Sequence, residues 1–110
     1  MRNELFNQML SAYDLTTEQQ KLNATFEVNQ QIILAGLYNG GFFDEAAFYG
    51  GTCLRIFHGL QRFSEDMDFS LLAPNDKFDF TNFFQPIIDQ FAMVGRNIEI
   101  KKKDKESKVL

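Results

Sequence analysis

The apolar positions near the start of the chain recur at helical spacing. In residues 3–13, Phe6, Met9, Leu10 and Tyr13 stand at i, i+3, i+4 and i+7, so all four lie on one side of a helix. This pattern predicts a short amphipathic helix.

A second, longer helix is expected over residues 16–38. Thr16 or Thr17 offers an N-cap, and Gln19 or Gln20 follows three residues later in the capping-box position. The main apolar side chains fall on one broad face: Leu22, Phe26, Ile33 and Leu37. The Asn-Gly-Gly sequence that follows should end the helix, because glycine adopts the left-handed cap conformation without steric cost.

Short strands and helices alternate in the next part of the chain. Residues 46–49 form an apolar run bounded by acidic and glycine residues, which predicts a buried strand. Gly50-Gly51-Thr52 is expected to be a turn, and residues 53–58 a short helix that leaves it. Residues 66–72 begin with alternating polar and apolar side chains, which predicts another strand.

The last part of the chain continues this alternation. Residues 80–93 predict a helix, although Pro86 weakens that assignment. Its inward side chains are expected to be Phe84, Ile87, Ile88 and Phe91. A strand is expected at 97–103, a turn at 104–106 and the beginning of a further strand at 109–110. Because that strand begins at the last residues, the pattern indicates the first part of a longer domain.

These elements predict an α+β fold for a single domain over residues 1–110. Residues 1–41 form its helical N-terminal part, and residues 42–110 carry a small mixed sheet with helices packed on one face. The composition is compatible with a packed core, since 45% of the residues are hydrophobic and 13 are Phe.

The charge is unevenly distributed around a net value of −4. Residues 1–100 carry six basic and thirteen acidic side chains, whereas the last ten residues carry five basic and two acidic ones. An acidic body argues against a dedicated nucleic-acid coat, because binding the phosphate backbone depends on Lys and Arg. The basic end is interpreted as a solvated strand edge or loop rather than a phosphate contact.

Several features indicate a cytoplasmic protein without a membrane association. The longest apolar run is far shorter than a membrane span, and the N-terminus lacks the pattern of a signal peptide. The single cysteine, Cys53, cannot form an internal disulfide, which fits a reducing compartment.

Two carboxylates and two glycines carry the candidate chemistry. Asp66 and Asp68 stand at i and i+2, which places them on one face of the expected strand. Their hard oxygen atoms suit Mg²⁺, and two metal ions held together stabilise both the attacking and the leaving oxygen in phosphoryl chemistry. Gly50 and Gly51 lack side chains, so their backbone can approach phosphates closely and offer N–H donors at a helix N-terminus.

The segments FYGGTCLR and RFSEDMDFSLL resemble a known family. The Gly-Gly pair followed by Asp-apolar-Asp-apolar is similar to the signature of the DNA polymerase β-like nucleotidyltransferases. The fuller pattern resembles the AbiEii-type abortive-infection toxins, the nucleotidyltransferases of type IV toxin–antitoxin pairs. The likeness is tight over residues 46–72 and looser over 73–103. Fourteen residues separate Gly51 from Asp66, slightly more than is usual in the superfamily.

The resemblance implies roles for seven residues. The nucleotide-binding ones would be Gly50, Gly51, Thr52, Arg62 and Ser64. The catalytic and metal-holding ones would be Asp66 and Asp68, with Mg²⁺ or Mn²⁺ as the cofactor. The family's third acidic residue and catalytic lysine would lie beyond Leu110.

The resemblance also implies a function. The protein would move a nucleotide from a nucleoside triphosphate to an acceptor hydroxyl on a tRNA or a protein, and it would have a cognate antitoxin. The alternative is an inactive fragment that folds and binds nucleotide or an antitoxin partner without turnover. A purely structural domain, in which the aspartates have no ligand, is the third interpretation.

Individual residues also keep a second interpretation. The aspartate pair could be the solvated face of an edge strand, and Gly50-Gly51 an ordinary turn. Arg55 is equally compatible with a surface role and with phosphate contact.

Three further residues complete the set of candidates. His58 is interpreted as a surface helix residue, since no second ligand stands at zinc spacing. Cys53 is interpreted as a small buried hydrophobe rather than a nucleophile. Glu99 is a weaker candidate for the third carboxylate.

Overall fold

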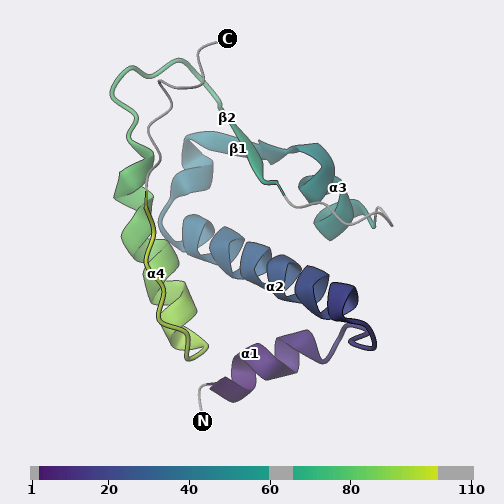
Figure 1. The fold of residues 1–110 in the computed structure, drawn as a ribbon. Helices are drawn as coiled ribbons and strands as arrows, with labels where there is room; N and C mark the ends of the chain where they lie inside the picture. Colours follow the sequence, from purple (N-terminus) through teal and green to yellow (C-terminus); the bar gives the residue numbers. More distant parts are fainter. Residues whose placement is uncertain (1–2, 60–65, 102–110) are drawn as a thin grey trace.

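The computed structural model describes residues 3–59 and 66–101. Within these residues the chain forms four α-helices, two short 3-10 helices and a two-stranded sheet (Figure 1). The order of the elements is α1 (Asn3–Leu10), α2 (Glu18–Asn39), η1 (Phe42–Asp44), β1 (Ala46–Tyr49), α3 (Gly50–His58), β2 (Asp68–Leu71), η2 (Phe80–Phe83) and α4 (Phe84–Met93). The α+β class and the helical N-terminal part predicted from the sequence are therefore confirmed.

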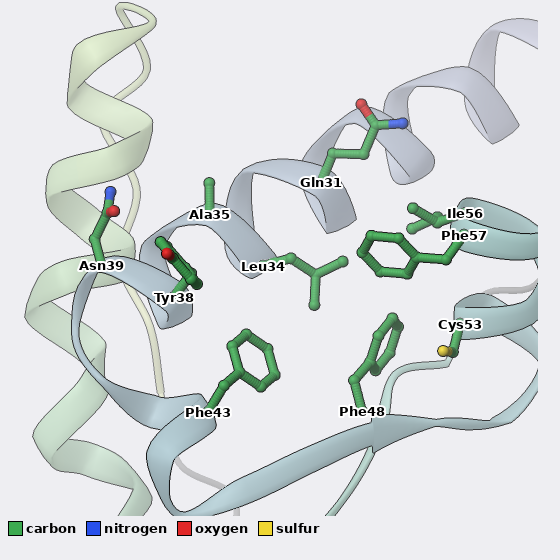
Figure 2. Close-up of a pocket in the computed structure, with 10 residues that line it drawn as sticks. All are labelled: Gln31, Leu34, Ala35, Tyr38, Asn39, Phe43, Phe48, Cys53, Ile56 and Phe57. Carbon is green, nitrogen blue, oxygen red and sulfur yellow. The ribbon is translucent and has the colours of Figure 1, made fainter.

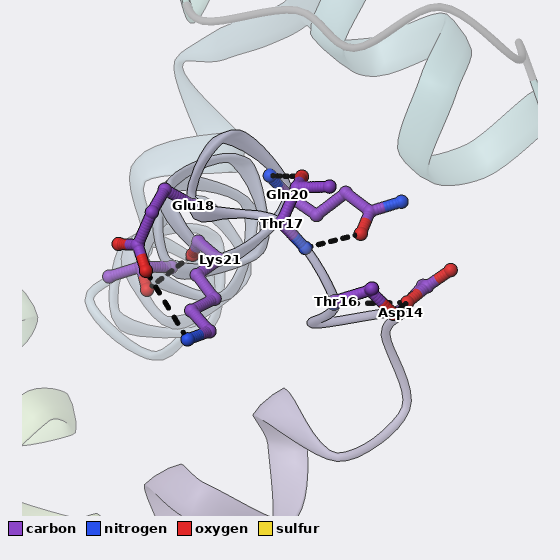
Figure 3. A network of polar contacts seen from close by, with 7 residues as sticks. Asp14, Thr16, Thr17, Glu18, Gln20 and Lys21 are labelled. Atoms are coloured by element: carbon purple, nitrogen blue, oxygen red, sulfur yellow. Dashed lines mark hydrogen bonds and ion pairs between the residues drawn. The ribbon is translucent and has the colours of Figure 1, made fainter.

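Helix α2 begins at a capping box (Figure 3). The Thr17 hydroxyl accepts a hydrogen bond from the Gln20 amide at 3.0 Å, and the Thr17 amide donates to Gln20 Oε1 at 2.9 Å. This arrangement satisfies two amides that have no partner inside the helix. Of the two predicted caps, Thr17 is therefore the one used. At the other end, Gly41 adopts the left-handed conformation with a φ of 82°.

The buried face of α2 differs from the predicted one. Leu37 is fully buried, but Leu22 and Phe26 are 51% and 38% exposed. The apolar residues that are buried are Ala24, Val28, Ile32, Leu34 and Leu37, and the polar residues Glu27 and Gln30 are buried with them. Helix α2 is the central element and has neighbours on several sides, so its exposed and buried positions do not follow one simple stripe (Figure 1).

Helix α4 packs directly against α2 through a glycine. A Cβ atom at Gly36 would lie 2.7 Å from the Cα of Ile87 and 2.9 Å from the carbonyl oxygen of Pro86. The two backbones therefore approach more closely than any side chain would allow. Pro86 lies in the first turn of α4, where its missing N–H costs no helical hydrogen bond. The helix predicted over 80–93 is therefore present in two parts, the 3-10 turn η2 followed by α4.

Strands β1 and β2 pair antiparallel, with Ala46 opposite Leu71 and Tyr49 opposite Asp68. The strand predicted at 46–49 is confirmed, but of its four residues only Ala46 is buried. Strand β2 is shorter than the predicted 66–72. The strand predicted at 97–103 is wrong over residues 97–101, which form no strand. There Ile98 and Ile100 pack against the core as irregular chain. Residues 102–103, the turn at 104–106 and the strand start at 109–110 lie outside the described residues.

A cluster of phenylalanines joins the sheet to the helices. Phe42 is 1% exposed, and its ring centroid lies 5.0–6.1 Å from those of five others. These five rings belong to Phe43, Phe69, Phe78, Phe80 and Phe83. All five contacts with Phe42 are edge-to-face, the geometry that aromatic rings prefer. Phe42 and Phe83 of this group are buried core residues, whereas Phe80 is 36% exposed.

The close approach of α2 and α4 leads to a prediction. Gly36→Ala should lower the free energy of unfolding by about 1–3 kcal/mol, because the new methyl group pushes against the backbone of α4. Chemical denaturation of both proteins measures this difference. Lys21→Ala on the exposed side of α2 serves as the control and should change it by less than about 0.5 kcal/mol. A Gly36→Ala protein as stable as the wild type would contradict this helix contact.

Candidate functional site

The first turn of α3 and the start of β2 form the candidate site. Gly50 opens α3 with a φ of 89°, a conformation that only glycine adopts readily. A Cβ atom there would lie 2.6 Å from Oδ2 of Asp68. Glycine is therefore required at position 50 for two reasons: the positive φ of the backbone, and the carboxylate of Asp68, which leaves no room for a Cβ atom.

The sequence predicted Gly50-Gly51-Thr52 as a turn that precedes a helix. In the structure these three residues are instead the first turn of α3, because the chain enters the helix directly from β1 at Tyr49. The amide groups of a helix's first turn have no acceptor within the helix and favour negative charge. The carboxylate of Asp68 thus lies beside a helix start.

Thr52 ties the chain before β2 to α3. Its side chain is 1% exposed, and its hydroxyl donates a hydrogen bond to the backbone carbonyl of Asp66. The hydroxyl predicted to contact nucleotide therefore has a structural bond in this protein. It holds Asp66 close to the glycine turn.

Asp66 and Asp68 do not share a strand face as predicted. Strand β2 begins at Asp68, opposite the last residue of β1, and Asp66 lies two residues before it. Pairing with β1 ends there because the chain of β1 continues into α3. Each aspartate lies against α3: the Asp68 carboxylate beside Gly50, and the Asp66 backbone at the hydroxyl of Thr52.

Both carboxylates are exposed to solvent, and within residues 3–59 and 66–101 neither forms an ion pair. Glu99 does not join them: it is 81% exposed at its side chain and pairs with Lys101 at 3.7 Å. No group of three possible metal ligands occurs among the residues that the structure describes. Arg62 and Ser64, the predicted phosphate-binding residues, lie outside those residues.

Comparison with known families shows which family the chain belongs to. Residues 32–109, more than half of its length, match the family described as nucleotidyl transferase AbiEii toxin, type IV toxin–antitoxin system. The chain belongs to the AbiEii toxin family. The matched region contains the glycine turn and both aspartates. No curated protein and no solved structure gives a significant match. None of the described helices of this AbiEii family member is both long and apolar enough to span a bilayer.

An ion pair between a buried carboxylate and a partly exposed arginine joins α2 to α3, the helix that begins at the AbiEii glycine turn. Glu27 of α2 is 5% exposed, and its Oε2 pairs with Nε of Arg55 on α3. Arg55 thus has a defined partner on α2, and the phosphate contact considered from the sequence stays a prediction. Glu27 was not among the candidate residues predicted from the sequence. The available signal was a single acidic residue between Phe26 and Val28, the only one between Glu18 and Asp44.

Tyr13 completes this network. Gln31 Nε2 donates a hydrogen bond to the Tyr13 hydroxyl at 3.1 Å. Burial, together with the hydrogen bond and the charge of Glu27, raises the pKa of Tyr13 to about 12. Tyr13, Glu27 and Arg55 line a cavity of about 270 Å³ between α2 and α3.

A wide apolar cavity of this family member lies apart from the aspartates. It has a volume of about 630 Å³ and opens between α2, β1 and α3 (Figure 2). Its walls come mainly from Leu34, Phe43, Phe48, Ile56 and Phe57, and no charged residue is among its ten lining residues. His58 is exposed at the end of α3, as it was interpreted, whereas Cys53 lines the cavity and is only half-buried instead of buried.

The contact between Gly50 and Asp68 can be tested by stability. Gly50→Ala should lower the free energy of unfolding by at least about 1–3 kcal/mol, because it adds backbone strain and a collision with the carboxylate. Gly59→Ala is the matched control, since Gly59 has a similar φ of 74° but a Cβ there would meet nothing within 4 Å. Gly59→Ala should therefore cost only the strain, about 1–2 kcal/mol.

The same comparison in an Asp68→Ala background isolates the collision. Without the carboxylate, Gly50→Ala should cost no more than Gly59→Ala, as measured by chemical denaturation. Equal costs of Gly50→Ala in both backgrounds would contradict the contact.

The raised pKa of Tyr13 predicts how stability depends on pH. The folded protein keeps the phenol proton up to about pH 12, whereas the unfolded chain releases it near pH 10. The stabilisation is thus complete below pH 10 and is lost as the pH rises towards 12. Tyr13→Phe should remove this loss, seen as a flatter dependence of the unfolding free energy on pH.

Tyr38→Phe is the control for this experiment, because Tyr38 is 73% exposed. Its pH dependence should match the wild type. Identical slopes for all three proteins would show that Tyr13 is not held in its neutral form.

Proposed function

We propose that this chain binds a nucleoside triphosphate together with Mg²⁺ or Mn²⁺ at the first turn of α3. In the toxin it would move a nucleotide from the triphosphate to an acceptor hydroxyl on a tRNA or a protein. The observation that carries this proposal is the close approach of Asp68 to Gly50. It places a carboxylate beside backbone amides that favour phosphate oxygens.

The donor atoms at this site fit a divalent metal ion. Asp66 and Asp68 offer exposed carboxylate oxygens, the ligands that Mg²⁺ prefers. Bound there, the metal would neutralise charge on the triphosphate and stabilise the reacting oxygens. The chain itself supplies the fixed position of Asp68 and the bond from Thr52 that holds the backbone of Asp66.

Phosphate binding is assigned to the glycine turn and to the segment before Asp66. Gly50 and Gly51 leave the helix start open to a ligand, because neither carries a side chain. Arg62 and Ser64 are assigned from the family resemblance, Arg62 because a guanidinium can donate two parallel hydrogen bonds to phosphate oxygens.

A second candidate is binding without turnover. It is favoured by the small number of possible metal ligands at the site: among the described residues, Asp66 and Asp68 are not joined by a third. In that case the chain binds nucleotide, or the cognate antitoxin expected of its family, but transfers nothing.

Metal dependence of binding tests the proposal. Calorimetric titration of the chain with ribonucleoside triphosphates should show tighter binding with Mg²⁺ or Mn²⁺ than with a chelator present. Asp68→Asn should remove most of this difference, because an amide keeps the volume of the carboxylate but loses its charge. Asp66→Asn should act in the same direction.

Asp76→Asn, a change of one exposed aspartate in the loop after β2, is the control and should leave the affinity unchanged. Equal affinity with and without metal would overturn the metal site. Transfer of labelled nucleotide to tRNA or protein by the wild type, lost in Asp68→Asn, separates the enzyme from the second candidate.

A further inference from the structure

Helix α3 carries the glycine turn, yet little apolar packing holds it. Thr52 is its only fully buried residue, while Leu54 and Phe57 are 49% and 62% exposed. Apolar contacts alone therefore leave the position of α3 weakly defined. The polar contacts of this helix must contribute much of its placement.

The ion pair between Glu27 and Arg55 is such a contact. Glu27 is 5% exposed on the central helix α2, and Arg55 lies one turn after Thr52 on α3. Removing a carboxylate from water is costly, and a buried pair often contributes no more stability than apolar residues of similar size. Such a pair does, however, depend strongly on geometry, so it defines how two helices lie against each other.

The position of α3 determines where its first turn lies relative to Asp66 and Asp68. Gly50 lies in contact with the carboxylate of Asp68, and Thr52 holds the backbone of Asp66. A small shift of α3 along or around its axis would separate the turn from both aspartates. The ion pair on the other side of α3 opposes this shift.

We propose that Glu27 is a positioning residue for the triphosphate site and acts through Arg55. The carboxylate fixes α3 on α2 and thereby keeps the glycine turn in register with Asp68. This inference rests on the proposed function, because the position of the glycine turn affects binding only if the turn binds the triphosphate. It also differs from a direct role of Arg55 on phosphate, since the guanidinium is bonded to a buried carboxylate.

Glu27→Gln is the main variant, because it keeps the shape of the side chain and removes the charge. Glu99→Gln is the matched control, the same chemical change at a surface pair with Lys101. Glu27→Asp and Arg55→Lys are milder variants that keep the charges and change the geometry. They keep the test available if Glu27→Gln does not fold.

The first readout is hydrogen exchange of the free protein. Amides of residues 54–57 close the first turns of α3 onto residues 50–53. Glu27→Gln should speed their exchange about tenfold while the amides of α4 keep their wild-type rates, because the loss is local. Equal acceleration in α3 and α4, or none in α3, would overturn the positioning role.

The second readout is affinity for Mg²⁺ with the ribonucleoside triphosphate that binds the wild type best, measured well below the melting temperature. Glu27→Gln and Arg55→Gln should each raise Kd about tenfold, and the double variant should be no weaker than either, because one contact is lost in all three. Glu27→Asp should recover part of the affinity, and Glu99→Gln should match the wild type.

Other results would overturn the inference. A lower melting temperature with unchanged Kd would show that Glu27 only stabilises the fold. Weak binding by Arg55→Gln with normal binding by Glu27→Gln would show that Arg55 contacts phosphate directly. A wild type that binds no triphosphate would overturn the proposed function instead, and the exchange rates would still decide whether Glu27 holds α3.

Discussion

The edge-to-face contact between Phe42 and Phe69 determines which side of the sheet Asp68 faces. Phe42 is buried at the junction of helices and sheet, and Phe69 is the second residue of β2. Because side chains alternate across a strand, an inward Phe69 turns Asp68 towards the opposite side. The strand is short and has one partner among the described residues, so the ring contacts of Phe69 help to fix the register set by its pairing with β1. The orientation of Asp68 therefore depends on the apolar packing of Phe69, the next residue along the strand.

Helix α3 is held from two sides by charged groups rather than by a broad apolar face. On one side its first turn meets the carboxylate of Asp68, and on the other Arg55 meets the carboxylate of Glu27. Between them, the hydroxyl of Thr52 binds the backbone before β2. The start of this helix is partly buried: Gly50 and Gly51 are half-buried and Thr52 is buried.

Local patterns in the sequence predicted the elements whose structure is decided locally. The capping box of Thr17 and the strand at Ala46–Tyr49 follow from side chains within a few positions of each other. Gly50 and Asp68 were chosen as candidates from their types and spacing; the structure brings them into contact, and their role in binding stays a prediction. Asp66 was misplaced on the strand, because the length of β2 is set by where β1 ends. The missing strand at 97–101 and the buried Glu27 also depend on distant partners, which no local pattern contains.

The contact between Gly36 and the backbone of α4 has a consequence for synthesis. The ribosome completes α2 at Asn39, but the residues that cover Gly36 are Pro86 and Ile87, almost fifty positions later. At about 5–20 residues per second, several seconds pass between the two. Throughout that interval the nascent chain carries α2 without α4, the helix that covers its Gly36. The contact between α2 and α4 therefore forms only after the glycine turn and both aspartates have been synthesised, since residues 50–68 precede residue 86.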